Sequence, residues 1–406
     1  MEEVIVGGEK LVENLKNFNF EKAVEKDMSK MNNLNIIVIG KTGTGKSTLL
    51  NAVFGEELAA IGSGKPITQH CRKYSLPNST INIYDSKGIE TGMGTEEYNE
   101  FYSVINDQNN SANTNEYIHI CWYCVQEVGD RLEPNEIEVI GKIQSNIPVI
   151  VTVTKSIGGA GAQKFADEIQ KELSSIGNIN VIPVMAQKMS KESEYGEMKI
   201  KAHGIDKLVE KSYYLLPDSV KDTFATYQKV NMELKEKKAK EIALTSAGAV
   251  AAAAFQPFPI ADAPIMVAIQ VAMMVRITAS FGIKPSDMKF GSILSGLGGP
   301  FAAAVVGRGA VSLLKLIPGL GTLLGGAINA ATGATITLAI GHIYIASISS
   351  LLKRKIKITQ ESLREEMERN SKDVDINKFK KEWESNKDNY SKEDAEKIKS
   401  EVEISL

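Results

Sequence analysis

The sequence predicts an α/β domain with a mostly parallel sheet and helices on both faces, followed by an all-α, apolar helical domain. Strand and helix patterns alternate from residue 34 to about residue 215, which is typical of a parallel sheet covered by its connecting helices. Strand patterns then stop at about residue 219. Long stretches without a charged side chain follow, as expected for buried or membrane-associated helices.

Each predicted element has its own pattern. The expected strands are residues 34–40, 71–76, 80–85, 116–125, 147–154 and 179–185. Residues 1–33 have apolar side chains at helical spacing and predict an N-terminal helical segment. The charged stretch 219–241 predicts a single helix, and residues 263–281 predict another.

The predicted organisation has four parts. They are an N-terminal helical segment (1–33), the α/β domain (34–215), the apolar helical domain (216–354) and a charged helical tail (355–406). The stretches without charged residues are 242–261, 290–307 and 316–352. The tail is rich in Lys and Glu and predicts a solvated face or an interaction arm.

Composition excludes some functions. The 406 residues contain 47 Lys and Arg against 50 Asp and Glu, so no strong positive field favours nucleic acid, and we expect no nucleic-acid partner. The acidic start of the chain lacks a secretory signal pattern, and the three cysteines fit a reducing compartment. We therefore expect a cytoplasmic protein.

Cys121 and Cys124 form a C-x-x-C pattern that would suit a redox or zinc site. The pattern falls on a predicted strand, where positions i and i+3 point to opposite faces of the sheet. The two thiols are therefore expected to be structural.

The stretch IIVIGKTGTGKSTLLN (36–51) predicts a phosphate-binding loop. It fits G-x-x-x-x-G-K-[ST] between a buried strand and a helix, the context that this motif requires. Backbone N–H groups and the helix N-terminus favour an anion here. Lys46 is expected to reach the β- and γ-phosphates, and Ser47 to bind Mg²⁺. The predicted nucleotide contacts in the loop are Gly40, Lys41, Thr42, Gly43, Thr44, Gly45, Lys46, Ser47 and Thr48.

Two further elements complete the predicted magnesium and γ-phosphate site. INIYDSKGIE (81–90) ends in D-x-x-G, so Asp85 is expected to hold the Mg²⁺ shell through water and the Gly88 N–H to meet the γ-phosphate. GSGKPITQH (62–70) occupies the place of switch I in small GTP-binding domains, and Thr68 is the candidate to close on Mg²⁺ and the γ-phosphate; the alternative is a loop threonine with a capping role. Lys46, Thr68 and Gly88 are the candidate catalytic residues.

The residue that orients the attacking water is not evident. Ile89 follows Gly88, where Ras-like proteins often have Gln. Lys41, Thr42, His70 or a partner molecule are the alternatives, and a slow intrinsic rate is expected.

The base-reading loop is incomplete. Thr154 and Lys155 fit the start of [NT]-K-x-D, but Ile157 replaces the Asp that accepts hydrogen bonds from guanine. Ala186 and Gln187 occupy the place of the last base-contacting loop. GTP and GDP, with Mg²⁺, are the expected cofactors, with a smaller preference for guanine than an intact motif would give.

Together these residues resemble the Era-like and septin-like side of the P-loop GTPases, which includes the immunity-related (interferon-inducible) GTPases. The resemblance covers about residues 34–215, and GKTGTGKSTLLNAVFG with GKPITQH and D-x-x-G looks like bacterial members. Residues 251–282 and 313–345 resemble the apolar C-terminal domain of unassigned function that accompanies some bacterial GTPases. The resemblance implies a GTP-hydrolysing switch whose helical domain meets a membrane or a partner, and N-terminal helices that join the C-terminal ones.

The sequence leaves two functions open for the apolar domain. Residues 316–352 are long enough for a hairpin of membrane helices, and their small residues allow close helix contact in lipid. Gln270 and Arg276 oppose a membrane span, and the Ala-rich composition also suits a soluble bundle. The first function is a GTPase that associates with membrane lipid or forms homo-oligomers; the alternative is a soluble regulatory NTPase that binds a protein partner.

Overall fold

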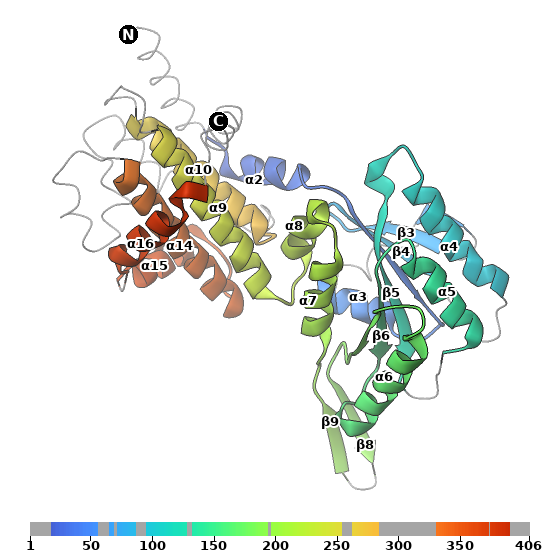
Figure 1. Ribbon diagram of the computed structural model, residues 1–406. Coiled ribbons are helices and arrows are strands. Elements are labelled where there is room, and N and C mark those ends of the chain that lie inside the picture. Colours follow the sequence, from blue (N-terminus) through green and yellow to red (C-terminus); the bar gives the residue numbers. More distant parts are fainter. Residues whose placement is uncertain are drawn as a thin grey trace. The chain divides into compact units, whose positions relative to one another are not determined.

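The computed structural model describes residues 18–55, 65–68, 71–86, 95–127, 132–193, 196–253, 262–283, 330–372 and 374–389. The chain divides into two compact units. One, here called the α/β unit, is Met31–Met232. The other, the helical unit, combines Met1–Lys30 with Glu233–Leu406 (Figure 1).

The α/β unit contains a seven-stranded sheet in the order β2-β3-β4-β1-β5-β6-β7. Its strands are β1 (Leu34–Gly40), β2 (Lys65–Pro66), β3 (Cys71–Ser75), β4 (Ile81–Ser86), β5 (Ile118–Gln126), β6 (Val149–Thr154) and β7 (Asn180–Pro183). β4, β1, β5, β6 and β7 run parallel, and β2 and β3 are antiparallel to their neighbours. All residues of β1 and β6 are buried, which explains why apolar residues predominate in both strands.

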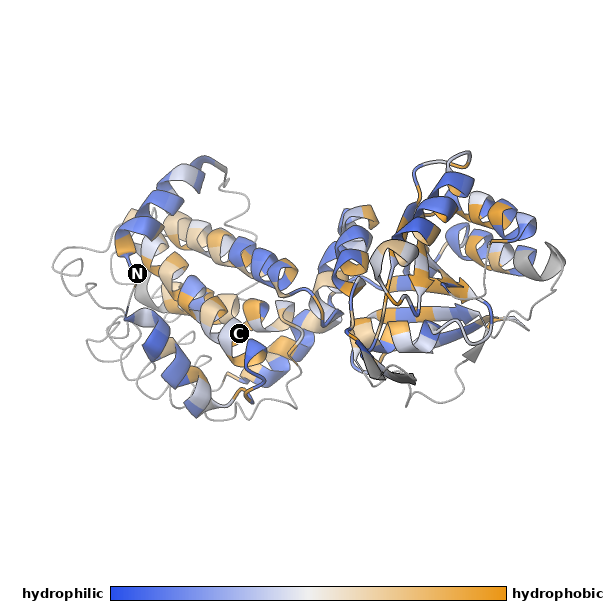
Figure 2. Ribbon diagram, turned by 90° about the horizontal axis from the view of Figure 1, so that it is seen from below, coloured by the Kyte–Doolittle hydropathy of each residue, from blue (hydrophilic) through white to orange (hydrophobic). Residues whose placement is uncertain are grey.

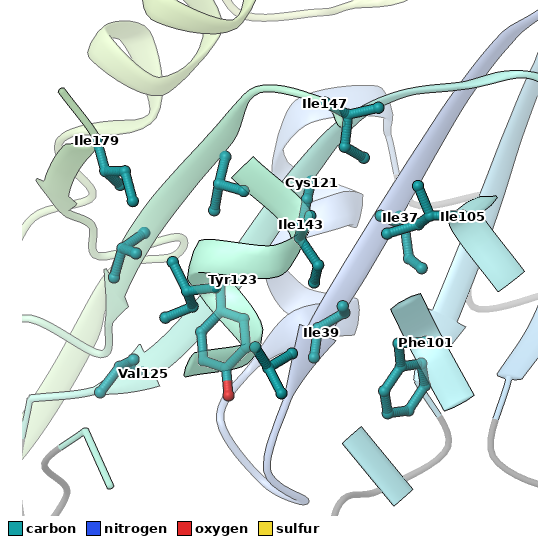
Figure 3. Packing of buried hydrophobic residues seen from close by; sticks show 14 of the residues in the cluster. Ile37, Ile39, Phe101, Ile105, Cys121, Tyr123, Val125, Ile143, Ile147 and Ile179 are labelled. Atoms are coloured by element: carbon teal, nitrogen blue, oxygen red, sulfur yellow. The ribbon is translucent and has the colours of Figure 1, made fainter. Parts of the chain in front are cut away.

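Helices cover both faces of this sheet. The helices of the unit are α3 (Lys46–Phe54), α4 (Thr95–Asn109), α5 (Pro134–Gln144), α6 (Gly159–Leu173), α7 (Ile205–Leu215) and α8 (Asp218–Tyr227), with the short 3-10 helix η2 (Thr114–Glu116). One face packs against α4, α5 and α6 in a core that includes Ile37, Tyr123 and Phe101 (Figure 3). On the other face Trp122 stacks on Phe54 of α3 and donates to Ser212 Oγ of α7 at 3.0 Å. The predicted fold class of this unit is confirmed.

The structure adds strands that the sequence analysis did not predict. β2 is only two residues long and contains a proline, so its sequence gives no alternating pattern. β8 (Met189–Ser193) and β9 (Gly196–Ile200) form a separate antiparallel pair of largely polar sequence. β8 has one apolar residue, and the alternation in β9 is limited to Met198 and Ile200, so the periodicity was too short to identify either strand.

The prediction of a single helix over 219–241 is wrong. α8 ends at Tyr227, and α9 (Met232–Ala253) begins after a turn. The fully buried Gln228 holds that turn: its Oε1 accepts from the N–H groups of Val230 and Asn231 at 2.8 and 2.7 Å, and its Nε2 donates to Asn231 O at 2.6 Å. The Lys229 N–H also donates to Val53 O at 2.8 Å. A charged helical pattern continues through this break, so the sequence alone did not reveal it.

The helical unit is built around α14 (Ala330–Lys353). Its other described elements are α2 (Phe20–Ser29), α9, α10 (Asp262–Ser280), α15 (Gln360–Ser371), α16 (Ile376–Asn386) and η4 (Lys387–Asn389). α14 packs against α10, α15 and α16, and α2 packs against α10. The predicted helix 263–281 is therefore present, and part of the N-terminal segment joins the C-terminal helices.

The apolar helices of this unit pack closely against one another (Figure 2). A Cβ atom on Gly341 of α14 would lie 2.6 Å from Ala243 Cβ of α9, so the backbones meet there without an intervening side chain. The buried polar side chains that the structure describes in this unit are paired, as in the contact of Thr278 Oγ1 with the Tyr344 hydroxyl at 2.7 Å. Of the helices that the structure describes, α14 has the length and composition for a membrane crossing, and most of it is buried inside the unit.

Candidate functional site

The loop between β1 and α3 forms the centre of the candidate site. Gly43 and Gly45 have φ of +80° and +91°, a backbone conformation that favours glycine. α3 begins at Lys46 without a side-chain cap and without an acidic residue in its first turn. Its first N–H groups are therefore available to an anion, which fits the predicted phosphate contacts from Gly40 to Thr48.

Lys46 turns back over its own loop. Its Nζ donates to Gly40 O at 2.7 Å and to Lys41 O at 3.1 Å, and the side chain is almost fully buried. Burial lowers the pKa of this lysine, while the charge of Asp85 acts in the opposite direction. The loop thus holds the Lys46 ammonium group away from water, where its electrostatic attraction for a phosphate chain would be strongest.

Asp85 lies at the end of β4, next to β1, with Val38 as its partner in the parallel ladder. Its Oδ1 is buried and has no hydrogen-bond partner among the described residues. Burial raises the pKa of this carboxyl to about 6, against the opposing charge of Lys46. A buried, unpaired carboxylate oxygen fits the hydration shell of a divalent cation, and Ser47, the predicted direct ligand, is exposed at the start of α3.

The switch residues are only partly described. Thr68 Oγ1 accepts a hydrogen bond from the Cys71 N–H at 3.0 Å, and the Thr68 N–H donates to Cys71 O at 3.2 Å. In this structure the side chain therefore stabilises the turn into β3, which is the capping role considered above. Among the described residues Oγ1 has no other partner, so its second lone pair could bind a cation. Gly88, Ile89 and His70 lie outside the described residues.

The predicted base-reading loop contacts the phosphate loop directly. The Thr154 hydroxyl lies 2.5 Å from Thr44 O and 3.1 Å from Val125 O. Lys155 has a φ of +52°, and its Cε lies 4.0 Å from the position of a Cβ on Gly45. Half-buried Ala186 and exposed Gln187 follow β7, at the same carboxyl edge of the sheet. Ligands of open α/β sheets bind at this edge.

Lys41 is held away from free solvent by a carboxylate pair. Its Nζ lies 3.3 Å from Glu133 Oε1 and 3.3 Å from Glu136 Oε2. Glu136 is buried at the start of α5 and accepts from the Tyr123 hydroxyl at 2.8 Å. Lys41 therefore ties the phosphate loop to α5, and water orientation by this lysine would require it to leave these ion pairs. The sequence shows the E-x-x-E pattern of a capping box at 133–136. It does not show that these carboxylates form ion pairs with Lys41.

Two more residues of the site edge were missed by the sequence analysis. The Glu127 carboxylate accepts from the Ile157 N–H at 2.9 Å. His203 pairs with Met185 through two backbone hydrogen bonds of 3.0 Å, and its Nε2 lies 3.2 Å from Ser156 O. Both residues meet the base-reading loop from distant parts of the chain, and no sequence pattern marks either of them.

The C-x-x-C pair is structural, as predicted. Cys121 and Cys124 are buried and not disulfide-bonded. Cys121 belongs to the core on one face, whereas Cys124 lies beneath Gly40 on the other. Burial raises the pKa of the Cys124 thiol to about 12, so it stays protonated and unreactive at neutral pH. The described residues contain no metal-binding group of three His, Cys, Asp or Glu side chains.

This sheet, its phosphate loop and its base-side loops have the arrangement of the P-loop GTPase fold. Comparisons with known proteins agree: residues 35–155 match the family model of the 50S ribosome-binding GTPase, and residues 219–371 match that of a domain of unknown function (DUF697). The resemblance to an apolar C-terminal domain of unassigned function is therefore confirmed. The resemblance to immunity-related GTPases stays a prediction.

Septins are among the relatives with curated descriptions. Septin-8-A of Danio rerio is 27% identical over 182 residues, which cover 39% of this chain and 43% of that protein. Septin-8 of Homo sapiens is 25% identical over 180 residues, which cover 39% of this chain and 37% of that protein. The chain thus spans about two fifths of the length of the curated relatives that it matches.

Solved structures with some likeness include Toc33 from Arabidopsis thaliana in complex with Mg²⁺ and GMPPNP. It is 17% identical, has a TM-score of 0.32, and the match covers 53% of this chain and 97% of Toc33. A probable GTP-binding protein, engB, is 19% identical with a TM-score of 0.30, over 45% of this chain and 97% of that one.

Proposed function

We propose that this chain binds GTP and GDP with Mg²⁺ at the loop of residues 40–48, hydrolyses GTP slowly, and uses the nucleotide state to control its helical unit. The observation that carries the first part is the buried ammonium group of Lys46 together with the buried Oδ1 of Asp85. The loop holds the ammonium group, and the charge of Asp85, whose Oδ1 has no partner among the described residues, acts on it. A triphosphate and a hydrated cation would satisfy both groups.

Each residue has a role in this proposal. Lys46 neutralises the β/γ-phosphate charge, the N–H groups of the loop orient the phosphates, and Ser47 and Asp85 hold the cation directly and through water. Mg²⁺, when bound, withdraws charge from the phosphate oxygens. Thr68 and the Gly88 N–H sense the γ-phosphate. Ile89 has no polar group to orient water, so the intrinsic rate is slow or depends on a partner.

Nucleotide binding is the direct test. Titration of GTP, GDP and ATP with and without Mg²⁺ should show Mg²⁺-dependent binding with guanine preferred over adenine. Lys46→Ala should abolish binding, whereas the matched control Lys171→Ala, on the exposed side of α6, should bind as the wild type does. Ser47→Asn should weaken triphosphate binding more than diphosphate binding. Equal or tighter binding of ATP by the wild type would rule out the GTPase assignment.

For the helical unit we propose nucleotide-dependent association with a membrane or self-assembly. The long stretches without charge and the composition of α14 support a lipid-facing role. Flotation of the protein with liposomes, in the presence of GDP or a non-hydrolysable GTP analogue, should then show more bound protein in the GTP state.

The second candidate is a soluble switch whose helical unit binds a protein partner. The burial of α14 within its own unit favours this candidate, because core helices of soluble proteins have the same length and composition. In this case the protein would stay unbound in both nucleotide states of the flotation experiment, and its sedimentation would not change with lipid.

A further inference from the structure

Ile157 leaves the base-reading loop without its expected carboxylate. Its side chain is 49% exposed and cannot accept a hydrogen bond. Guanine presents two adjacent donors, N1–H and the N2 amino group, whereas adenine presents an acceptor at N1. A carboxylate at this position therefore attracts guanine and repels adenine, and its loss would remove most of that discrimination.

A carboxylate nevertheless reaches this position from another strand. Glu127 Oε2 accepts from the Ile157 backbone N–H at 2.9 Å. The carboxylate therefore lies beside the residue from which the missing Asp side chain would have extended. One hydrogen bond uses only part of its capacity, because an ionised carboxylate offers about four acceptor positions over its two oxygens.

The topology explains how Glu127 comes to this position. β5 and β6 are parallel neighbours, with Gln126 opposite Thr154 in the ladder, and the Glu127 N–H donates to Thr154 O at 3.1 Å. Glu127 therefore leaves the sheet beside the base-reading loop at the shared carboxyl edge. Lys155 adds a second link between the ends of β5 and β6. Its Nζ donates to Gln126 Oε1 at 3.1 Å, and its Cε lies near Gly45 of the phosphate loop.

We propose that Glu127 is the guanine-specifying residue of this protein and that its carboxylate replaces the Asp absent at position 157. This inference rests on the proposed nucleotide function. Oε2 stays with the Ile157 N–H, and the remaining acceptor positions bind N1–H and the N2 amino group of guanine. We therefore expect the preference for guanine over adenine to be as large as in a base-reading loop that has its Asp.

The test exchanges one atom of Glu127. Glu127→Gln keeps a carbonyl oxygen for the Ile157 N–H, so the loop stays in place, but it exchanges an acceptor for an NH₂ donor. XTP carries xanthine, which has a C2 carbonyl where guanine has its amino group. This carbonyl can accept a hydrogen bond from the new NH₂ donor. GTP affinity should fall about ten- to hundredfold, as for loss of hydrogen bonds to a charged group, and XTP affinity should rise. Glu172→Gln, an exposed residue of α6, is the control and should bind GTP and XTP as the wild type does.

Two further measurements separate base recognition from loop positioning. ITP lacks the N2 amino group, so the wild type should bind it more weakly than GTP, and this difference should shrink in Glu127→Ala. Ile157→Asp added to Glu127→Ala should restore the preference for GTP over XTP. A purely positioning role predicts instead that Glu127→Ala weakens GTP, ITP, XTP and ATP equally, and that result would overturn the inference.

The inference and the proposed function fail in different ways. An unchanged GTP to XTP ratio in Glu127→Gln, with binding still lost in Lys46→Ala, overturns the role of Glu127 and leaves the nucleotide site intact. A wild type that binds no guanine nucleotide overturns both.

Discussion

Gly40 lies against Cys124 of β5, and this contact limits which residues can occupy position 40. A Cβ there would lie 2.5 Å from Cys124 O and 3.1 Å from Thr44 Oγ1. The backbone carbonyl can move only if β5 shifts relative to β1. The requirement for glycine at this position thus comes from packing between two central strands as well as from phosphate binding.

Gly40→Ala should therefore destabilise the α/β unit by about 1–3 kcal/mol, the usual cost of overpacking, and should weaken GTP binding. Gly161→Ala is the control, because Gly161 lies in α6 with nothing within 4 Å of its added Cβ. That change should stabilise the helix by up to about 1 kcal/mol. Chemical denaturation and nucleotide titration of both variants provide the measurement, and a Gly40→Ala protein as stable as the wild type would contradict the packing argument.

His119 links the stability of the α/β unit to pH. Burial lowers the pKa of this histidine from 6.5 to about 4, and its Nδ1 accepts from the Asn35 N–H at 3.2 Å. A protonated ring has no acceptor at Nδ1, so protonation would break this hydrogen bond. Between pH 6.5 and 4 the unfolded chain binds the proton more tightly, so the free energy of unfolding should fall as the pH falls through this window.

Between pH 7 and pH 5 the loss should be on the order of 2 kcal/mol, because about 1.5 pH units of this interval lie below the unfolded pKa and each unit corresponds to about 1.4 kcal/mol. His119→Gln should reduce the difference in unfolding free energy between pH 7 and pH 5. The fluorescence of Trp122, in a Trp383→Phe background, would report the α/β unit alone, because the chain has two tryptophans. The same pH dependence in both proteins would contradict this role of His119.

At the scale of the elements, α14 depends on small residues at its crossing with α9. A Cβ on Gly341 would lie 2.6 Å from Ala243 Cβ and 3.2 Å from Met273 Sδ of α10. Two neighbouring helices therefore meet α14 at the same residue. This packing explains the Gly- and Ala-rich sequence without requiring lipid, because small residues allow close contact in a soluble core as well.

Gly341→Val should destabilise the helical unit by about 1–3 kcal/mol or more, because neither neighbouring helix can move independently. Ala346→Val introduces the same side chain on the exposed side of α14 and should change stability by less than about 0.5 kcal/mol. Denaturation followed by the fluorescence of Trp383 in α16, in a Trp122→Phe background, compares the two. Equal stability of the two variants would show that α9 and α14 do not pack as described.

At the scale of the whole molecule, the proposed switch requires that the nucleotide state reach the helical unit. Gln228 fixes the turn after α8, where the α/β unit ends, and α9 begins four residues later in the sequence. Ordering of Thr68 and Gly88 by a γ-phosphate is the event that would start the change, as in other nucleotide switches.

We expect GTP loading to increase hydrogen exchange within residues 242–352, by exposure of apolar surface, and to produce oligomers or lipid-bound protein. Hydrogen exchange, sedimentation and liposome flotation in the GDP state and in a non-hydrolysable GTP state are the measurements. Thr68→Ala should bind nucleotide but show no difference between the two states. Identical results for the wild type in both states would favour a nucleotide-stabilised scaffold over a switch.

Much of the α/β unit followed from local sequence. The apolar run 36–39 of β1, the glycines of the phosphate loop and the Asp near the end of β4 lie in one short part of the chain. Pattern and spacing therefore predicted both their structure and their place in the site. The apolar character of α10 and α14 likewise predicted helices. The largely polar pair of β8 and β9 carried only a short apolar pattern, and a continuous helical pattern concealed the turn at Gln228.

The sequence by itself determined the class of fold, the phosphate loop and the absence of an acceptor at Ile157. Only the tertiary structure brought Glu127 to Ile157, paired Lys41 with the carboxylates at the start of α5, and buried the Oδ1 of Asp85 where the charge of Lys46 acts on that carboxyl. The physical reason is that a local motif consists of residues adjacent in sequence, whereas the parallel sheet brings together the ends of strands that are distant in the chain. Contacts between those ends decide the charge and the hydrogen bonding of the site.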